Sequence, residues 1–148
     1  MLPMIVSQQG QRPPIGHPGE FGAATTTDAL SGKRVLLVED EAFIAFDLTF
    51  ALERVGVDVV HARTLAQALH AVSEQEFDAA ILDVTLGTDQ TCRPVADELD
   101  TKGTPYIIHS GDLARHGEVL ETLDAPIIPK PAQANDVVSA LARTLVTG

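Results

Sequence analysis

The sequence predicts an α/β fold in which a doubly wound parallel sheet of five strands is covered by helices on both faces. Short continuous apolar segments, typical of strands buried on both faces, recur along the chain from residue 33 onward. Each is followed by a segment whose apolar residues repeat at helical spacing. Strict alternation of such strands and helices implies right-handed crossovers, and therefore parallel strands.

Each element is predicted from its own pattern. The five expected strands are the apolar segments at residues 34–38, 57–62, 77–84, 104–110 and 125–129. The five expected helices carry periodic apolar residues at 44–55, 65–72, 95–99, 113–120 and 137–145. Gly56 is placed to end the first helix, and we expect the last helix to be capped near Asn135.

The chain is expected to contain one domain and one tail. Residues 1–32 are rich in Gly, Pro, Gln and Thr, which predicts a disordered N-terminal extension, and residues 33–148 are expected to form the domain. A length of 148 residues with 45% hydrophobic content suits a single core. Because the sequence ends directly after the last expected helix, we expect a single-domain protein without a separate output domain.

Charge and cysteine content narrow the function classes. A net charge of −11, from 21 acidic and 10 basic residues, argues against binding to nucleic acid or to an anionic membrane. The single cysteine excludes an internal disulfide framework and indicates a reducing compartment. No signal peptide or membrane-spanning segment is recognisable in the sequence. We therefore expect a cytoplasmic protein whose partners are basic or mixed in charge.

Polar residues follow the strands where functional groups gather in doubly wound sheets, beyond the carboxyl ends. They are Glu39, Asp40 and Glu41 after the first strand, Asp83 in the third, Ser110 in the fourth, and Lys130 with Pro131 after the fifth. Taken singly, each could be a helix cap, a turn residue or a solvated charge. Several carboxylates at one edge would repel one another strongly unless a cation intervened. Ligands that are all oxygen favour Mg²⁺.

These residues stand in four motifs, VEDE, ILDV, HSG and PKP, in which Asp40, Asp83, Ser110 and Lys130 are separated by 43, 27 and 20 positions. In this order the motifs resemble the receiver domains of bacterial two-component response regulators, over roughly residues 33–146. The resemblance implies a flavodoxin-like sheet with strand order 2-1-3-4-5.

The resemblance also implies a role for each residue. Asp83 would accept a phosphoryl group from a histidine kinase or a phosphotransfer protein and form an acyl phosphate. The expected Mg²⁺ ligands are Asp40, Asp83, the backbone carbonyl of Thr85, and Glu39 through a water. Residues expected around the phosphoryl group are Ser110 as the switch hydroxyl, Lys130 oriented by a cis bond to Pro131, and Thr85 and Asp112, which tune its hydrolysis.

One position departs from the family. Ile127 stands three residues before Lys130, where the family usually carries an aromatic switch residue. A degenerate receiver that binds proteins without phosphorylation therefore remains an alternative. An enzyme that uses Asp83 on an external substrate is disfavoured because the loops are short. A nucleotide-binding module is disfavoured because no G-x-G-x-x-G or Gly-Lys phosphate loop follows the first strand.

Three further features are interpreted from their positions alone. Phe43, Phe46 and Phe50 in the first helix are interpreted as core residues, with an exposed surface for a helical partner as the alternative. Tyr106 is expected to pack in the fourth strand rather than to replace the missing switch. His109 should point away from Ser110 by strand alternation and have a structural role.

Overall fold

The computed structural model describes residues 27–111 and 117–147, and its centre is a five-stranded sheet in the order β2-β1-β3-β6-β7. The strands are β1 (Arg34–Val38), β2 (Asp58–Ala62), β3 (Ala79–Leu82), β6 (Tyr106–Ser110) and β7 (Ile127–Pro129). All four neighbouring pairs are parallel. In chain order of the sheet strands this is 2-1-3-4-5, which confirms the predicted fold class.

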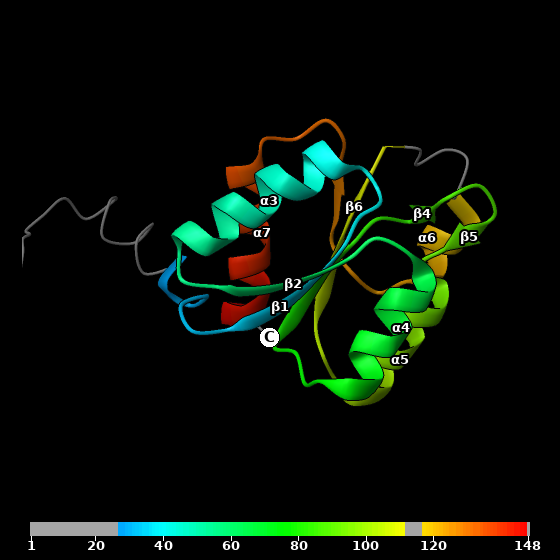
Figure 1. Cartoon of the computed structure of the whole chain (residues 1–148), viewed down its shortest axis with the longest axis horizontal. Coiled ribbons are helices and arrows are strands. Elements are labelled where there is room, and N and C mark those ends of the chain that lie inside the picture. Colours follow the sequence, from blue (N-terminus) through cyan, green and yellow to red (C-terminus); the bar gives the residue numbers. More distant parts are fainter. Residues whose placement is uncertain (1–26, 112–116, 148) are drawn as a thin grey trace, which may run out of the picture.

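Helices cover both faces of this sheet. They are α3 (Ala42–Arg54), α4 (Leu65–Glu74), α5 (Arg93–Lys102), α6 (Gly117–Thr122) and α7 (Ala134–Thr147). Figure 1 shows α3 and α7 together on one face, and α4, α5 and α6 on the other. Among the residues that the structure describes, no helix is long and apolar enough to cross a membrane.

The strand β1 shows why the sheet has two apolar layers. Val35 and Leu37 pack in the layer with α3 and α7, whereas Leu36 and Val38 pack in the layer with α4 and α5. Successive side chains of a strand point to opposite faces, so a strand covered on both sides is apolar at every position. This accounts for the uninterrupted apolar segment VLLV, which follows the exposed Arg34.

Local signals define the helix ends. The hydroxyl of Thr64 accepts a hydrogen bond from the Gln67 N–H at 3.1 Å and caps α4. Gly103 ends α5 in the left-handed conformation, with φ of 72°. Gly56 follows α3 with φ of 90°, and a Cβ there would approach Ser31 Oγ to 2.9 Å. The predicted stop at Gly56 therefore has both a conformational and a steric cause.

The folded region begins earlier than predicted. Leu30 is fully buried in the layer formed by α3 and α7, and the Gly32 N–H donates to the Gly56 carbonyl at 2.8 Å. The expected boundary between residues 32 and 33 is therefore wrong, because residues 27–32 pack against the domain. The remainder of the expected extension, residues 1–26, lies outside the described residues.

One helix start and one hairpin also differ from expectation. The helix α7 begins at Ala134, so Asn135 lies inside its first turn and does not cap it. The first part of the helix expected at 113–120 lies outside the described residues, and its described part is α6. An antiparallel hairpin of β4 (Thr85–Leu86) and β5 (Gln90–Thr91) follows β3 and was not predicted. Strands of two residues are too short to show a period-2 pattern.

Candidate functional site

Main-chain pairing brings the ends of β1 and β3 together. Val38 is the register partner of Leu82, and the Asp83 N–H donates to the Val38 carbonyl at 3.0 Å. Glu39 and Asp83 therefore leave adjacent strands at the same level of the sheet. The backbone of the central strands, rather than a loop, fixes the two carboxylates side by side.

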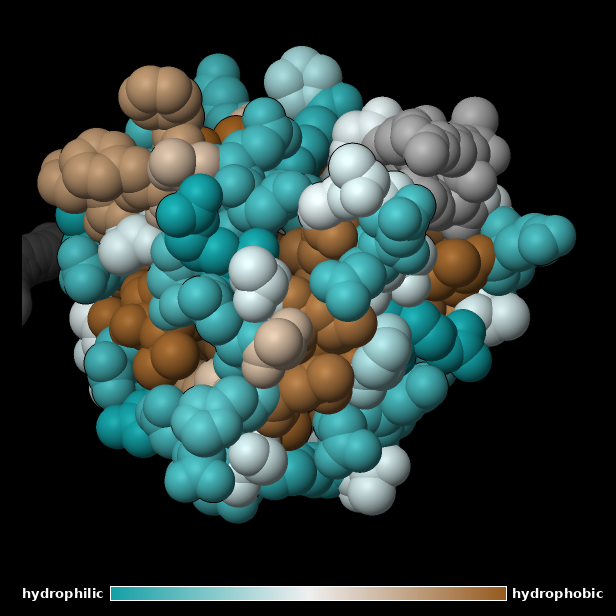
Figure 2. Space-filling view, turned by 45° about the vertical axis from the view of Figure 1, so that its right-hand side comes forward, coloured by the Kyte–Doolittle hydropathy of each residue, from teal (hydrophilic) through white to brown (hydrophobic). Residues whose placement is uncertain are grey.

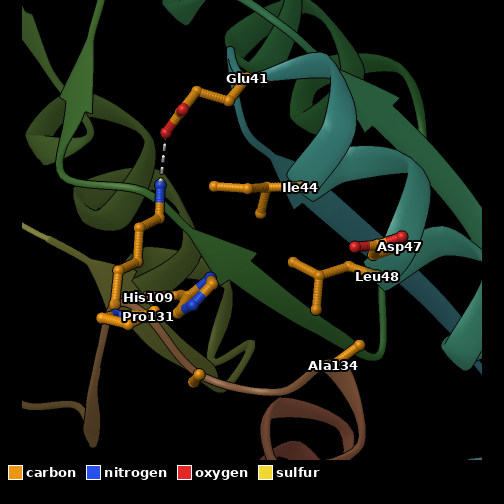
Figure 3. Close-up of a pocket in the computed structure, with 9 residues that line it drawn as sticks. Glu41, Ile44, Asp47, Leu48, His109, Pro131 and Ala134 are labelled. Carbon is orange, nitrogen blue, oxygen red and sulfur yellow. Dashed lines mark hydrogen bonds and ion pairs between the residues drawn. The ribbon is translucent and has the colours of Figure 1, made fainter.

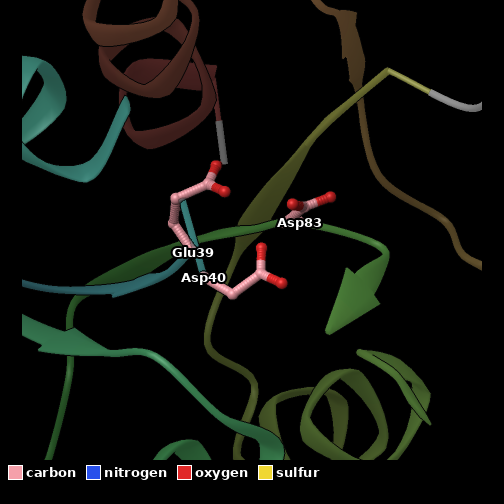
Figure 4. Close-up of side chains that lie close together, drawn as sticks. All are labelled: Glu39, Asp40 and Asp83. Carbon is pink, nitrogen blue, oxygen red and sulfur yellow. The ribbon is translucent and has the colours of Figure 1, made fainter. Parts of the chain in front are cut away.

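The acidic cluster consists of Glu39, Asp40 and Asp83, which each offer a carboxylate oxygen within 4.8 Å of the others (Figure 4). Glu39 and Asp83 are only 1% and 6% exposed. Burial, and secondly the Asp83 carboxylate, raises the pKa of Glu39 from its ordinary 4.5 to about 7. A set of crowded oxygen donors fits a small hard divalent cation.

Lys130 supplies the positive charge within the cluster. Its Nζ lies 3.0 Å from Asp83 Oδ2, 3.1 Å from Glu39 Oε1 and 3.4 Å from Glu41 Oε1. Burial by itself lowers the pKa of Lys130, but Asp83 and Glu39 outweigh it and leave the pKa above 10.5. The ammonium is therefore charged and shared among three carboxylates. The Lys130–Pro131 peptide bond is cis.

Backbone donors orient the carboxylates. The Glu41 N–H donates to Glu39 Oε2 at 3.1 Å, and the Thr85 N–H faces Asp83 Oδ1 at 3.4 Å. The Gly87 N–H, in the turn of the β4–β5 hairpin, donates to Asp40 Oδ2 at 3.1 Å. The unpredicted hairpin thus holds Asp40, and its turn contains Gly87 in the left-handed conformation, with φ of 77°.

A cavity of about 330 Å³ opens beside this cluster. It is lined by Asp40, Glu41, Asp83, Thr85, Ser110, Gly111 and Lys130. Ser110 is 1% exposed, at the end of β6. The cavity therefore brings together carboxylate, ammonium and hydroxyl groups. Asp112, which was expected here, lies outside the described residues.

Tyr106 packs as expected, whereas the phenylalanines do not. Tyr106 is buried, and its hydroxyl donates to Asp100 Oδ2 at 3.3 Å. Phe43, Phe46 and Phe50 are 88%, 70% and 56% exposed. The core interpretation of the three phenylalanines is wrong. Figure 2 shows apolar side chains protruding at the upper left, over α3.

Comparison with curated proteins gives three likenesses. The chain is 26% identical to "Response regulator receiver protein CpdR" of Brucella abortus over 118 residues, covering 77% of this chain and 98% of that protein. It is 41% identical over 56 residues to the transcriptional regulatory protein AlgB of Pseudomonas putida, and 26% identical over 110 residues to GTPase Der of Allorhizobium ampelinum. The chain spans only 12% and 23% of those two proteins. No family model matches the chain.

Similar solved structures also include response regulator proteins, like CpdR. A CheY-like receiver domain protein of Methanospirillum hungatei has a TM-score of 0.67 and 25% identity, covering 78% of this chain and 94% of that one. The response regulator PhyR of Brucella abortus has a TM-score of 0.71 and 23% identity, covering 87% and 56%. The fold and the acidic edge are those of a flavodoxin-like domain, and together with the likenesses above they support a receiver domain of the response-regulator type.

Proposed function

We propose that Asp83 accepts a phosphoryl group from a histidine kinase or a phosphotransfer protein and that the modified domain signals by binding another protein. The observation that carries this proposal is the placement of Lys130 Nζ 3.0 Å from Asp83 Oδ2, beside two further carboxylates that could hold a metal ion. A lysine in that place neutralises charge on transferred phosphoryl oxygens. Residues 33–148 form the receiver region, together with the packed segment 27–32.

The transfer is an in-line displacement at phosphorus. An Asp83 carboxylate oxygen forms the new P–O bond, while the bond between phosphorus and the donor nitrogen or oxygen breaks and the leaving group keeps its electron pair. Lys130 pairs with the phosphoryl oxygens in place of the Asp83 oxygen that becomes the bridging oxygen of the acyl phosphate. The buried hydroxyl of Ser110 donates to a phosphoryl oxygen in the modified state.

The acidic cluster is proposed to hold Mg²⁺. Asp40 and Asp83 would bind it directly, with the Thr85 carbonyl, and Glu39 would bind it through a water. The crowding of these carboxylates and the raised pKa of Glu39 support this fit. When bound, the cation supplies charge neutralisation for the phosphoryl group.

The output is proposed to be a switch in protein binding or a role as phosphate relay or sink, in the cytoplasm, without chemistry on an external substrate. Ile127, which is 39% exposed on β7, replaces the usual aromatic residue, so the response to Ser110 must pass through other groups. The exposed phenylalanines of α3 are a suitable surface for the phosphate-donating partner. Thr85 and Asp112 are proposed to tune hydrolysis of the acyl phosphate.

The proposal is tested by the intact mass of the chain after incubation with acetyl phosphate and Mg²⁺. We expect a gain of one phosphoryl group that requires the metal ion and disappears in Asp83→Asn. Asp78→Asn, which changes an acidic residue just before β3, serves as the matched control and should keep the gain. No gain in the unchanged chain would favour the degenerate, phosphorylation-independent binding module.

A further inference from the structure

A second cavity, of about 360 Å³, lies between α3 and the segment that leads from β7 to α7 (Figure 3). Ile44 and Leu48 of α3 form one wall, and Ala132 and Ala134 form the other. The volume lies within the range of pockets that bind small molecules. We name it the His109 cavity after the side chain described next.

His109 lies in β6, lines this cavity and is only 3% exposed. Neither ring nitrogen has a hydrogen-bond partner among the residues that the structure describes. In Figure 3 the ring extends into the space bounded by Ile44 and Leu48. A buried polar group without a partner is costly, so an occupant that bonds to His109 would gain binding free energy.

The available hydrogen bonds follow from the charge state of His109. Burial, and secondly the neighbouring Lys130, lowers its pKa below 6.5, so the ring is neutral at pH 7. A neutral imidazole has one N–H donor and one acceptor nitrogen. His109 lines a different cavity from Ser110, as strand alternation predicts, and its ring meets open space instead of a hydrogen-bond partner from the described part of the chain.

The charges around the His109 cavity favour a cation. The carboxylates of Glu41 and Asp47 line it, and its only lysine among the described lining residues, Lys130, is already within 3.4 Å of three carboxylates. The whole chain carries a net charge of −11. The walls between these charges are aliphatic, which suits a compact apolar body.

We propose that the His109 cavity binds a small amphipathic cation: an amidinium, guanidinium or amine on a compact apolar body. The body packs against Ile44 and Leu48, the charged end pairs with Asp47 and Glu41, and His109 supplies or accepts one hydrogen bond. A free small molecule and a basic side chain of a docking protein share this chemistry.

Binding in the His109 cavity reaches the acidic site through two shared residues. Glu41 and Lys130 line both cavities. Because Glu41 Oε1 is 3.4 Å from Lys130 Nζ, a cation that pairs with Glu41 competes with Lys130 for it. Occupancy therefore changes the charge balance around Asp83.

The test is a titration of the full chain with benzamidine in the absence of divalent ions, followed by ¹H–¹⁵N NMR. We expect saturable shifts at Ile44, Leu48 and Ala134, and none with benzoate. Ala134→Leu fills the cavity and should abolish the shifts, whereas Ala66→Leu, on the exposed side of α4, should not. Asp47→Asn should weaken binding about tenfold, because one charge-assisted pair is lost.

Each outcome decides the proposal independently of phosphorylation. Absence of saturable shifts, equal binding of benzoate, or unchanged binding in both Ala134→Leu and Asp47→Asn would overturn it. Asp47 is exposed, so its variant keeps the test valid even if Ala134→Leu does not fold. Binding of benzamidine supports the assignment, and tighter binding of a helical peptide with one arginine beside apolar residues identifies the source as a protein side chain.

Discussion

Lys130 lies in contact with Glu39 and Asp83, and the charges of the three groups affect the pKa values of Glu39 and Lys130. Glu39 is buried at the end of β1 and shares the Lys130 ammonium with Asp83 and Glu41. Its raised pKa means that the folded protein binds a proton there more tightly than the unfolded chain does. A divalent cation bound to the cluster, as proposed above, would compete with this proton.

We expect a pH-dependent stability that Mg²⁺ removes. With EDTA present, the contribution of Glu39 is complete below pH 4.5 and is lost as pH rises through about 7, so the free energy of unfolding should fall by about 1–3 kcal/mol over that window. Urea unfolding at several pH values measures it. Glu39→Gln should show a flatter profile over the same window, and a profile identical to that of the unchanged chain would contradict this assignment.

The candidate site could be predicted from sequence at the strand ends but not in the loops. Asp83 and Lys130 follow strands whose apolar segments are unambiguous, so the topology alone places them at one edge. The backbone N–H of Gly87 donates to Asp40, and a backbone contact of this kind cannot be predicted from side-chain patterns. The lack of a hydrogen-bond partner for the His109 ring among the described residues depends on which residues of other elements face it, and the periodicity of a sequence does not predict that.

The helix α3 presents two apolar faces. Ala45, Leu48, Ala51 and Leu52 are buried, whereas Phe43, Phe46 and Phe50 lie on the opposite side and are exposed. A sequence that is apolar on both sides does not show which side meets the sheet. The exposed side is available to a partner, and only the fold distinguishes it from the core.

Substitutions on the two faces of α3 should differ sharply in their effect on stability. Phe46→Ala should change the free energy of unfolding by less than about 0.5 kcal/mol, because the ring is largely in solvent. Leu52→Ala, on the buried face of the same helix, should cost about 2–5 kcal/mol. Chemical denaturation of both variants measures this contrast. A loss of similar size in the two would mean that Phe46 is packed.

Residues 27–32 pack against the rest of the domain and form its N-terminal segment. The side chain of Leu30 is buried in the apolar layer formed by β1, α3 and α7. The Gly32 N–H donates a hydrogen bond to the carbonyl of Gly56, which follows α3 in the chain. The composition of this segment resembles a linker, because one buried leucine gives no periodic pattern. Only the folded structure shows that this segment contributes to the hydrophobic core.

A chain that begins at Lys33 should be less stable than one that begins at Thr27. Loss of the Leu30 side chain removes buried apolar surface, and we expect a cost of about 2–5 kcal/mol. Urea unfolding of the two versions measures the difference, and Leu30→Ala in the full chain separates the side chain from the backbone contacts. Equal unfolding midpoints would show that residues 27–32 contribute nothing to the domain.

Chemical mapping of the modified residue would show directly whether Asp83 is the phosphoacceptor. The chain is incubated with acetyl phosphate and Mg²⁺, treated with borohydride, which reduces an acyl phosphate to an alcohol, and analysed by peptide mass spectrometry. We expect homoserine at position 83 and unchanged aspartate at positions 40 and 78. Homoserine at Asp40, or phosphate retained on a serine or threonine, would contradict this expectation.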